Sequence, residues 1–343
     1  MSAQSIPVIE IPAKDLNHFD PNNFSFGKNF TNYMLEAEYS EGTWKNAVIK
    51  KFQPLTLDPS TAALHYGQTI FEGIKAFKNE KGEVVIFRPD QNFIRFNTSA
   101  ERMGMPTVPD WLFMEGMKQL VALEKDWIPN IPEASLYIRP FMIATDPFLG
   151  VRPSLTYKFM IILGPSGPYF SAPMKILIEQ KYTRATPGGV GFAKNGGNYG
   201  GSLYPVALAQ EKGYDQVLWT DAIEHKLVEE VGMMNVMFVI DGKVITPSVE
   251  RGTVLKGVTR NSAIILLRDM GYEVEERFLS VAEIVGAHKK GLFTEVFGVG
   301  TAAVVSYISK LAHAEYVMEF DVEALKVAPA LKKELNDIRM GNI

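Results

Sequence analysis

The chain has 343 residues, 46% of them hydrophobic and 22% charged, which is more than one hydrophobic core usually organises, so we expect two domains. Its 35 basic and 39 acidic residues give a net charge of -4, which argues against nucleic acid or an anionic membrane surface as a partner and favours small molecules. The absence of cysteine excludes disulfides, thiolate metal sites and cysteine nucleophiles, and five scattered histidines without ligand spacing predict no metal site.

The first half of the chain predicts short strands and one amphipathic helix. Strands are expected at Val84–Phe87, Leu136–Ala144 and Tyr157–Leu163, and a helix at Asp110–Lys125, where apolar residues recur at helical spacing. The segment GPSGPYFSAP that follows is rich in proline and glycine, which interrupt regular structure. We therefore predict an N-terminal domain over residues 1–165, a linker over 166–173 and a larger C-terminal domain over 174–343.

The second half predicts further strands and two helices. Strands are expected at Met174–Glu179, Val217–Thr220 and Val236–Ile240, the last turning at Asp241-Gly242 into a hairpin. Helices are expected near Ser202–Glu211 and from Thr259 or Arg260 to Met270, where Gly271 ends the second one. The pattern favours an α+β protein of two mixed α/β domains, with a ligand site in the cleft between them.

One lysine, Lys194, stands among seven glycines in the segment from Pro187 to Gly201. A phosphate-binding P-loop would need GxxxxGK[ST], but Ala193 and Asn195 occupy the two diagnostic positions, so that interpretation fails. Two alternatives remain from the residues alone. Lys194 is either a solvated lysine on a surface loop or an amine nucleophile that forms a Schiff base with a carbonyl.

Several longer motifs decide between these alternatives through a resemblance to a known family. They occur in one order along the chain: FGKNF from Phe26, LHYGQTIFEGIKAFK from Leu64, SLYIRPF from Ser135, KNGGNYG from Lys194, EEVGMMN from Glu229, GVTR from Gly257 and EVFGVGTA from Glu295. The sequence resembles branched-chain aminotransferases, in the longer, eukaryotic-like branch. These enzymes have pyridoxal-phosphate fold type IV, which D-amino-acid aminotransferase shares, so the resemblance implies that fold and a homodimer.

The resemblance implies a set of residues that bind pyridoxal 5'-phosphate. Lys194 would carry the cofactor and act as nucleophile and general base, and Glu230 would keep the ring nitrogen protonated. Tyr199 would donate to the phenolic oxygen. The phosphate would be bound by Arg95, Val258, Thr259 and Thr301. Val258 and Thr259 lie at the start of a predicted helix, where backbone N–H groups attract anions, whereas Arg95 would otherwise be interpreted as an exposed charge.

The resemblance also implies the residues that line the substrate site. They are Phe26, Tyr66, Phe71, Tyr137, Arg139, Tyr169, Met233, Thr301 and Ala302. Tyr66 would donate to the substrate α-carboxylate, and Arg139 to the second carboxylate of glutamate. The sequence departs from the family at two places. Met233 replaces a common threonine, and Ala303 and Ser306 replace the redox-active cysteines of mammalian relatives.

The function implied is a reversible, ping-pong transfer of the amino group of leucine, isoleucine or valine to 2-oxoglutarate, which gives the branched 2-oxo acid and glutamate. Two alternatives stay open: a D-amino-acid transaminase or lyase of the same fold, and a non-catalytic metabolite-binding protein. No apolar stretch has the length of a membrane span, and residues 1–20 fit neither a signal peptide nor a transit peptide. We therefore expect a cytoplasmic enzyme without a membrane partner.

Overall fold

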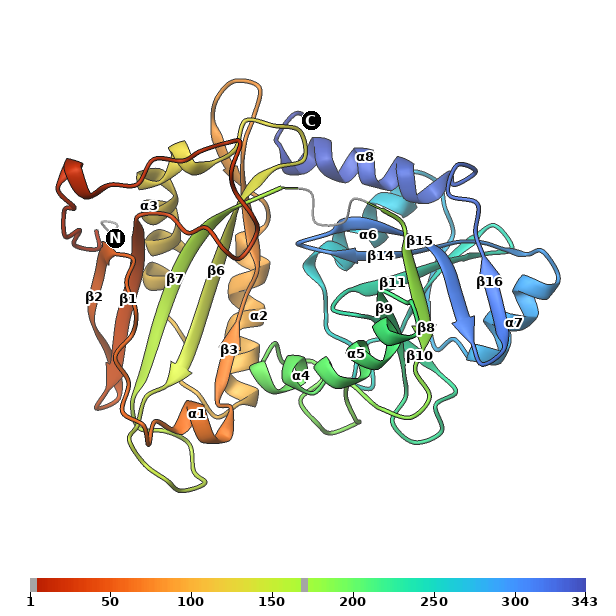
Figure 1. The fold of residues 1–343 in the computed structure, drawn as a ribbon, viewed down its shortest axis with the longest axis horizontal. Coiled ribbons are helices and arrows are strands. Elements are labelled where there is room, and N and C mark those ends of the chain that lie inside the picture. Colours follow the sequence, from red (N-terminus) through yellow and green to blue (C-terminus); the bar gives the residue numbers. More distant parts are fainter. Residues whose placement is uncertain (1–4, 168–171) are drawn as a thin grey trace. The chain divides into compact units, whose positions relative to one another are not determined.

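The computed structural model describes residues 5–167 and 172–343 and divides into two compact units (Figure 1). Unit 1 comprises Met1–Tyr169, Ala193–Gly197 and Arg339–Ile343, and unit 2 comprises Phe170–Phe192 and Asn198–Ile338. The sequence had assigned the residues around Lys194 to the second domain, whereas backbone contacts group them with unit 1. Part of the predicted linker, residues 168–171, lies outside the described residues.

Unit 1 is built on a seven-stranded sheet in the order β2-β1-β7-β6-β4-β5, with β3 paired to β6. Its strands are β1 (Tyr33–Ser40), β2 (Thr43–Lys51), β3 (Thr69–Phe71), β4 (Ile74–Lys78), β5 (Val84–Ile86), β6 (Ser135–Ala144) and β7 (Tyr157–Ser166). Its helices are α1 (Ala62–Tyr66), α2 (Pro89–Arg102) and α3 (Gly116–Leu123), a π-helix at Trp111–Glu115, and 3-10 turns at Ala13–Asp15 and Lys125–Trp127.

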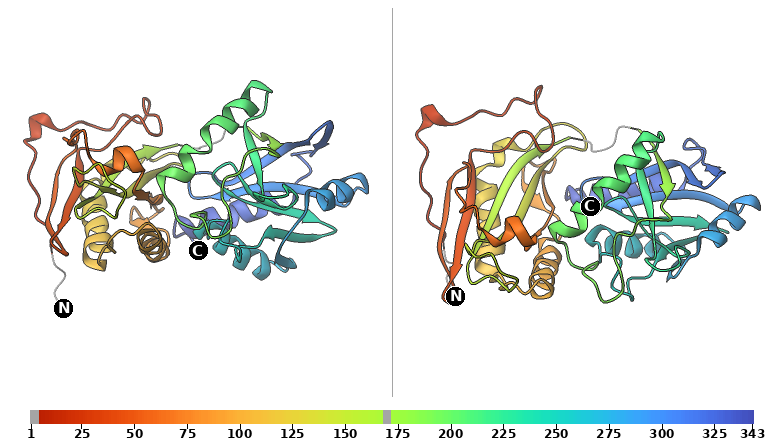
Figure 2. Two further views of the ribbon diagram at one scale, coloured as in Figure 1. Left: turned by 90° about the horizontal axis from the view of Figure 1, so that it is seen from below. Right: turned by 60° about the horizontal axis from the view of Figure 1, so that its bottom comes forward.

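Helices α2 and α3 cover the same face of this sheet (Figure 2). The contact is aromatic: Phe96 of α2 lies with its ring centroid 5.5 Å from that of Phe159 on β7, and Phe113 lies 5.9 Å from the same ring. Gly116 begins α3 at a point of close approach, since a Cβ there would lie 2.5 Å from Leu35 of β1. A continuous apolar core therefore joins the helices to the sheet.

Unit 2 is built on a nine-stranded sheet in the order β10-β9-β8-β15-β14-β11-β12-β13, with β16 paired to β15. Its strands are β8 (Met174–Ile178), β9 (Gln216–Thr220), β10 (Val228–Val231), β11 (Asn235–Ile240), β12 (Lys243–Pro247), β13 (Val274–Arg277), β14 (Phe293–Gly300), β15 (Val304–His313) and β16 (Tyr316–Glu319). Its helices are α5 (Leu203–Glu211), α6 (Val258–Asp269), α7 (Val281–Lys289) and α8 (Val327–Arg339), with α4 (Gly196–Gly200) following Lys194.

Strand β11 is buried on both faces, which explains its uninterrupted apolar sequence. Met237 and Val239 pack in the core that contains α6 and α8, whereas Phe238 and Ile240 pack in the core that contains α7. Successive side chains of a strand point to opposite faces, so one strand supplies both cores. The sheet of unit 2 is thus covered by helices on each side.

The structure confirms most of the predicted elements and corrects their boundaries. The predicted hairpin at Asp241-Gly242 forms between β11 and β12, and α6 ends at Asp269, just ahead of Gly271 at φ +89°. Residues 110–125 are not one regular helix but a π-helical turn followed by α3. Strand β7 runs on to Ser166, because Gly164, Pro165 and Ser166 pair with Tyr137, Leu136 and Ser135 of β6. The hairpin β1–β2 had not been predicted.

Two features are absent from residues 5–167 and 172–343. None of the helices found there combines the length and the apolar character that crossing a membrane requires. Within the same ranges, no three histidine, aspartate or glutamate side chains are grouped so that they could hold a metal ion.

The start of helix α8 is capped by the carboxylate of a buried glutamate, and a substitution there tests the fold. Glu295 of β14 accepts hydrogen bonds from the backbone N–H groups of Lys326 (2.7 Å), Val327 (2.9 Å) and Ala328 (3.0 Å). We predict that Glu295→Gln lowers the free energy of unfolding by about 1–3 kcal/mol, because charge-assisted capping of a helix start is lost. Urea denaturation measures this change.

The control for this test is Glu319→Gln, which removes an exposed glutamate that pairs with Lys310. This control should change the free energy of unfolding by no more than about 0.5 kcal/mol. Equal effects of the two substitutions would show that Glu295 has no special role at α8.

Candidate active site

Lys194 is held by its backbone against the sheet and α2 of unit 1. Its N–H donates to Oγ of Ser99 (2.9 Å), and its carbonyl accepts from the N–H of Phe71 (3.1 Å). Asn195 forms a β-bridge with Ile70. The Nζ atom lies 4.8 Å from the ring centroid of Phe71, and the side chain is half-buried. Lys194 is therefore not a solvated lysine on a surface loop, and the place of its amine is fixed.

The glycines around Lys194 permit close approach of neighbouring groups. A Cβ at Gly196 would lie 2.5 Å from Oγ1 of Thr69, and a Cβ at Gly191 would lie 2.7 Å from the carbonyl oxygen of Thr253. Any side chain at these two positions would displace backbone or β-strand atoms. Close packing within each unit therefore requires glycine at these two positions.

Arg95 of α2 forms a two-pronged ion pair with Glu72. Its Nε and Nη2 atoms each lie 2.7 Å from a carboxylate oxygen of Glu72, and Nδ2 of Asn92 donates to the same carboxylate at 2.7 Å. Burial by itself would raise the pKa of Glu72, but the positive charges of Arg95 and Lys194 and the hydrogen bonds outweigh it and hold the pKa below its usual value. Arg95 is not an exposed charge, and its contact with a cofactor phosphate stays a prediction.

Four of the predicted substrate residues form one cluster in unit 1. The guanidinium carbon of Arg139 lies 4.8 Å from the ring centroid of Phe71, and its Nη2 donates to the hydroxyl of Tyr137 (3.1 Å). The ring of Phe26 meets that of Tyr137 edge-on at 5.0 Å. Since Lys194 lies beside the same Phe71 ring, the apolar cluster and the amine are neighbours.

The Nε atom of Arg139 is buried, and no acceptor within the described part of the chain reaches it. Tyr66 is the last residue of α1 and is exposed. Tyr169 lies outside the described residues, so its predicted role is not addressed by the structure.

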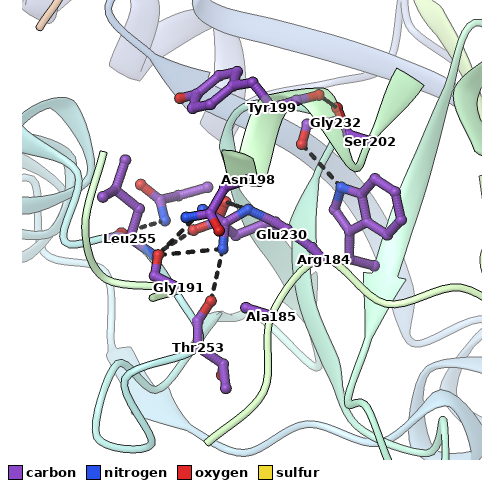
Figure 3. A network of polar contacts seen from close by, with 12 residues as sticks. Arg184, Ala185, Gly191, Asn198, Tyr199, Ser202, Glu230, Gly232, Thr253 and Leu255 are labelled. Atoms are coloured by element: carbon purple, nitrogen blue, oxygen red, sulfur yellow. Dashed lines mark hydrogen bonds and ion pairs between the residues drawn. The ribbon is translucent and has the colours of Figure 1, made fainter. Parts of the chain in front are cut away.

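In unit 2, Glu230 is a buried carboxylate on β10 rather than a surface residue (Figure 3). One of its oxygens lies 3.0 Å from Nε of Arg184, and the other accepts a hydrogen bond from the N–H of Leu255. The adjacent Glu229 is also buried, and burial together with the negative charge of Glu230 raises the pKa of Glu229. Both glutamates are therefore buried acids rather than surface charges.

The start of α6 has the features of an anion site. Its N-cap is Gly257, and no side chain caps the helix. A Cβ at Gly257 would lie 2.1 Å from Oδ1 of Asn235, so only glycine fits. The first residues, Val258 and Thr259, are buried, and their backbone N–H groups lie at the positive end of the helix dipole. The start of α6 therefore offers the N–H donors and the positive dipole end that the predicted phosphate contact requires.

The remaining predicted residues of unit 2 lie in turns and in α4. Thr301 and Ala302 form the half-buried turn between β14 and β15, and Met233 is exposed in the turn between β10 and β11. Tyr199 is half-buried in α4, where its carbonyl accepts hydrogen bonds from Ser202 (Figure 3). Each of these roles stays a prediction.

Comparison with known proteins decides the family. The family model described as amino-transferase class IV matches residues 69–311. The chain belongs to the class IV aminotransferases. It is 49% identical over 330 residues to branched-chain-amino-acid transaminase 1 of Bacillus subtilis, which covers 94% of this chain and 92% of that protein. It is 50% identical over 301 residues to a probable branched-chain-amino-acid aminotransferase of Staphylococcus epidermidis, which covers 86% and 84%.

A solved class IV structure confirms the predicted fold. The branched-chain amino acid aminotransferase from Escherichia coli superposes with a TM-score of 0.72 at 25% identity, covering 90% of this chain and 95% of that one. The predicted α+β architecture of fold type IV is therefore confirmed.

The residues present fit the pyridoxal 5'-phosphate that class IV aminotransferases use. An amine on a fixed backbone is present at Lys194, a buried carboxylate at Glu230 and an uncapped helix start at Gly257. These are the three chemical groups that an aldehyde, a pyridinium nitrogen and a phosphate require.

Sequence reasoning missed two residues that contact the predicted site residues directly. Glu72 lies inside the motif LHYGQTIFEGIKAFK but had been given no role, and Arg184 had not been singled out. No local signal marks either one, because Glu72 meets Arg95 across 23 positions and Arg184 meets Glu230 across 46. Only the fold brings these partners together.

We predict that Glu72→Gln lowers the free energy of unfolding at pH 7 by about 3–5 kcal/mol, because Arg95 is left as a buried charge without its carboxylate. The pKa of Glu72 is depressed in the folded protein, so this contribution is complete above pH 4.5 and is lost as the pH falls further. Urea denaturation at several pH values measures both effects.

The double variant Glu72→Gln/Arg95→Met removes both partners and should recover part of the loss. If the two single losses simply add in the double variant, the buried pair does not act as a unit.

Proposed function

We propose that this class IV aminotransferase is a branched-chain amino acid transaminase, which transfers the amino group of leucine, isoleucine or valine to 2-oxoglutarate in a reversible, ping-pong reaction. The observation that carries the proposal is the fixed, half-buried amine of Lys194 beside an aromatic cluster. The substrate class is supported by the relatives at 49% and 50% identity, both of which are named for branched-chain amino acids.

Each predicted cofactor residue has a role that its surroundings support. Bound pyridoxal 5'-phosphate supplies an aldehyde and a ring that accepts electrons from the substrate Cα. Lys194 would provide the amine that condenses with the aldehyde, and its freed amine would carry the proton between the substrate Cα and the cofactor C4′ as a general base and acid. Glu230 holds the proton on the ring nitrogen, and Tyr199 donates to the phenolic oxygen.

The phosphate would be held by groups of different chemistry. The N–H groups of Val258 and Thr259 donate at the start of α6, with Thr301 as a further donor. Arg95 supplies the positive charge, and Glu72 fixes the plane of its guanidinium. A rigid anion site holds the cofactor in one orientation while its substrate partner is exchanged.

Substrate selection requires one pocket to accept an apolar side chain and a carboxylate in turn. The rings of Phe26, Phe71 and Tyr137 provide apolar surface, with Tyr66, Tyr169 and Met233 as further lining. The buried Nε of Arg139 is a donor without an acceptor in the described part of the chain, which suits the second carboxylate of glutamate. The backbone of Thr301 and Ala302 and the hydroxyl of Tyr66 bind the α-carboxylate.

The proposal extends to location, assembly and domain boundaries. We propose a cytoplasmic homodimer, which the family resemblance and the free metabolites it would act on support, and sedimentation equilibrium tests the dimer. We also keep the division into domains at 1–165 and 174–343, with 166–173 as a linker; limited proteolysis tests that linker.

Borohydride reduction of the purified holoenzyme followed by peptide mapping is the central test. We predict a cofactor adduct on Lys194, a yellow colour that bleaches with L-leucine, and a loss of about 10²–10⁴-fold or more in turnover for Lys194→Ala, which removes the general base. The control Lys212→Ala removes an exposed lysine after α5 and should retain wild-type turnover.

Two outcomes would contradict the proposal. An adduct on another side chain would refute the role of Lys194. Bleaching by D-alanine but not by L-leucine would favour a D-amino-acid transaminase of the same fold instead.

We further predict that Arg139→Met raises the KM for 2-oxoglutarate by about 10- to 100-fold, because a charge-assisted hydrogen bond to its second carboxylate is lost. The KM for 4-methyl-2-oxopentanoate should change far less, because that side chain carries no charge. Steady-state kinetics with both oxo acids measure the difference. A parallel rise in both KM values would assign Arg139 to packing of Phe71 and Tyr137 rather than to recognition.

A further inference from the structure

The buried guanidinium of Arg184 joins three separate parts of unit 2. Its Nε lies 3.0 Å from Oε2 of Glu230, and its Nη1 donates to the carbonyl of Thr253 at 2.7 Å. Nη1 and Nη2 also reach the carbonyl of Gly191, at 3.4 and 3.3 Å (Figure 3). The side chains of Arg184 and Glu230 are only 7% and 3% exposed, so both charges are removed from water.

Glu230 is tied to the same turn by a second route. Its Oε1 accepts from the N–H of Leu255, whose carbonyl accepts from Nδ2 of Asn235 at 2.9 Å. The chain then continues through Gly257 into α6. Arg184 and Glu230 together therefore fix the turn that positions the predicted phosphate site.

If no cation were nearby, the surroundings of Glu230 would favour the protonated, neutral form of its carboxyl group. A carboxylate removed from water tends to take up a proton, and so does one beside another acid. Both conditions apply here, because Glu229 is buried next to Glu230. A protonated carboxyl would no longer favour a positive charge on a nearby ring nitrogen. Arg184 is in direct contact with Glu230, and the buried Arg260 of α6 attracts the same carboxylate electrostatically.

We propose that Arg184 is a positioning residue for the transamination. It keeps Glu230 charged and holds the Glu230 carboxylate in one orientation, and it fixes the turn leading to α6. This inference rests on the proposed function, since Glu230 matters for catalysis only if it faces the cofactor ring. A fork-shaped guanidinium serves this purpose better than an ammonium group, because it can bind the carboxylate and two carbonyls in one plane.

The test compares Arg184→Met, Arg184→Lys, Glu230→Gln and the double variant Arg184→Met/Glu230→Gln with the wild type. Infrared spectra of the apo proteins at neutral pH report protonated carboxyl groups, and fluorescence titration gives the dissociation constant for pyridoxal 5'-phosphate. Arg277→Met is the control, because Arg277 forms ion pairs with Glu275 and Glu283 on the outside of the same unit. Thermal unfolding followed by circular dichroism identifies variants that do not fold.

In difference spectra against the wild type, we expect Arg184→Met to show an added protonated-carboxyl band that the double variant does not show, whereas the bands of Glu124 and Glu229, whose pKa values burial raises, cancel. The dissociation constant for the cofactor should rise, and turnover should fall, each by about 10- to 100-fold, the usual effect of losing a buried charge-assisted hydrogen bond. In the Glu230→Gln background, the same substitution should lower turnover by less than in the wild-type background, because the part of its effect that passes through Glu230 is already lost while the bonds to Thr253 and Gly191 remain to be lost. Arg184→Lys should lack the band and lose affinity to a smaller degree, and Arg277→Met should match the wild type.

A missing band in folded Arg184→Met, or equal losses of turnover in both backgrounds, would overturn the inference. Should Arg184→Met fail to fold, an unchanged cofactor affinity of Arg184→Lys would overturn it instead. The failure of the proposed function would look different. In that case the wild type itself would bind no pyridoxal 5'-phosphate, while the carboxyl band would still decide whether Arg184 keeps Glu230 ionised.

Discussion

Pairing each buried carboxylate with a guanidinium is the physical constraint that acts on the predicted site residues of each unit. Unit 1 meets it with Glu72 and Arg95, and unit 2 with Glu230 and Arg184. A buried carboxylate without a partner would take up a proton, and burying a guanidinium without a partner would cost folding free energy. Each charged group therefore stabilises the other in its buried position. Glu72 with Arg95, and Glu230 with Arg184, are therefore stable in their buried positions only as pairs.

The two pairs fix different kinds of geometry. The first one sets the plane of the Arg95 guanidinium on α2, next to the segment that carries Lys194. The second one fixes the turn from Thr253 to Leu255, and with it the start of α6. Glycines at 191, 196 and 257 complete these arrangements, because the neighbouring backbone and side-chain atoms occupy the space that a Cβ would need. The rigidity of the site thus comes from ion pairs combined with close packing.

The departures from the family pattern lie around the substrate. Met233 is half exposed in the turn after β10, where its flexible side chain is free to adjust to ligands of different size. Ala303 and Ser306 stand beside the turn that holds Thr301, so no thiol switch operates there.

The sequence by itself determined what local patterns encode. The apolar run of β11, the hairpin at Asp241-Gly242, the end of α6 before Gly271 and the motif around Lys194 are all short-range signals, and each was found. The family resemblance added the other residues of the site. Tertiary structure decided which charges are paired, because Arg184 and Glu230, or Glu72 and Arg95, are distant in sequence and meet only when strands and helices pack. It also placed Lys194 with unit 1, since hydrogen bonds to Phe71 and Ser99 depend on a sheet that assembles from distant segments.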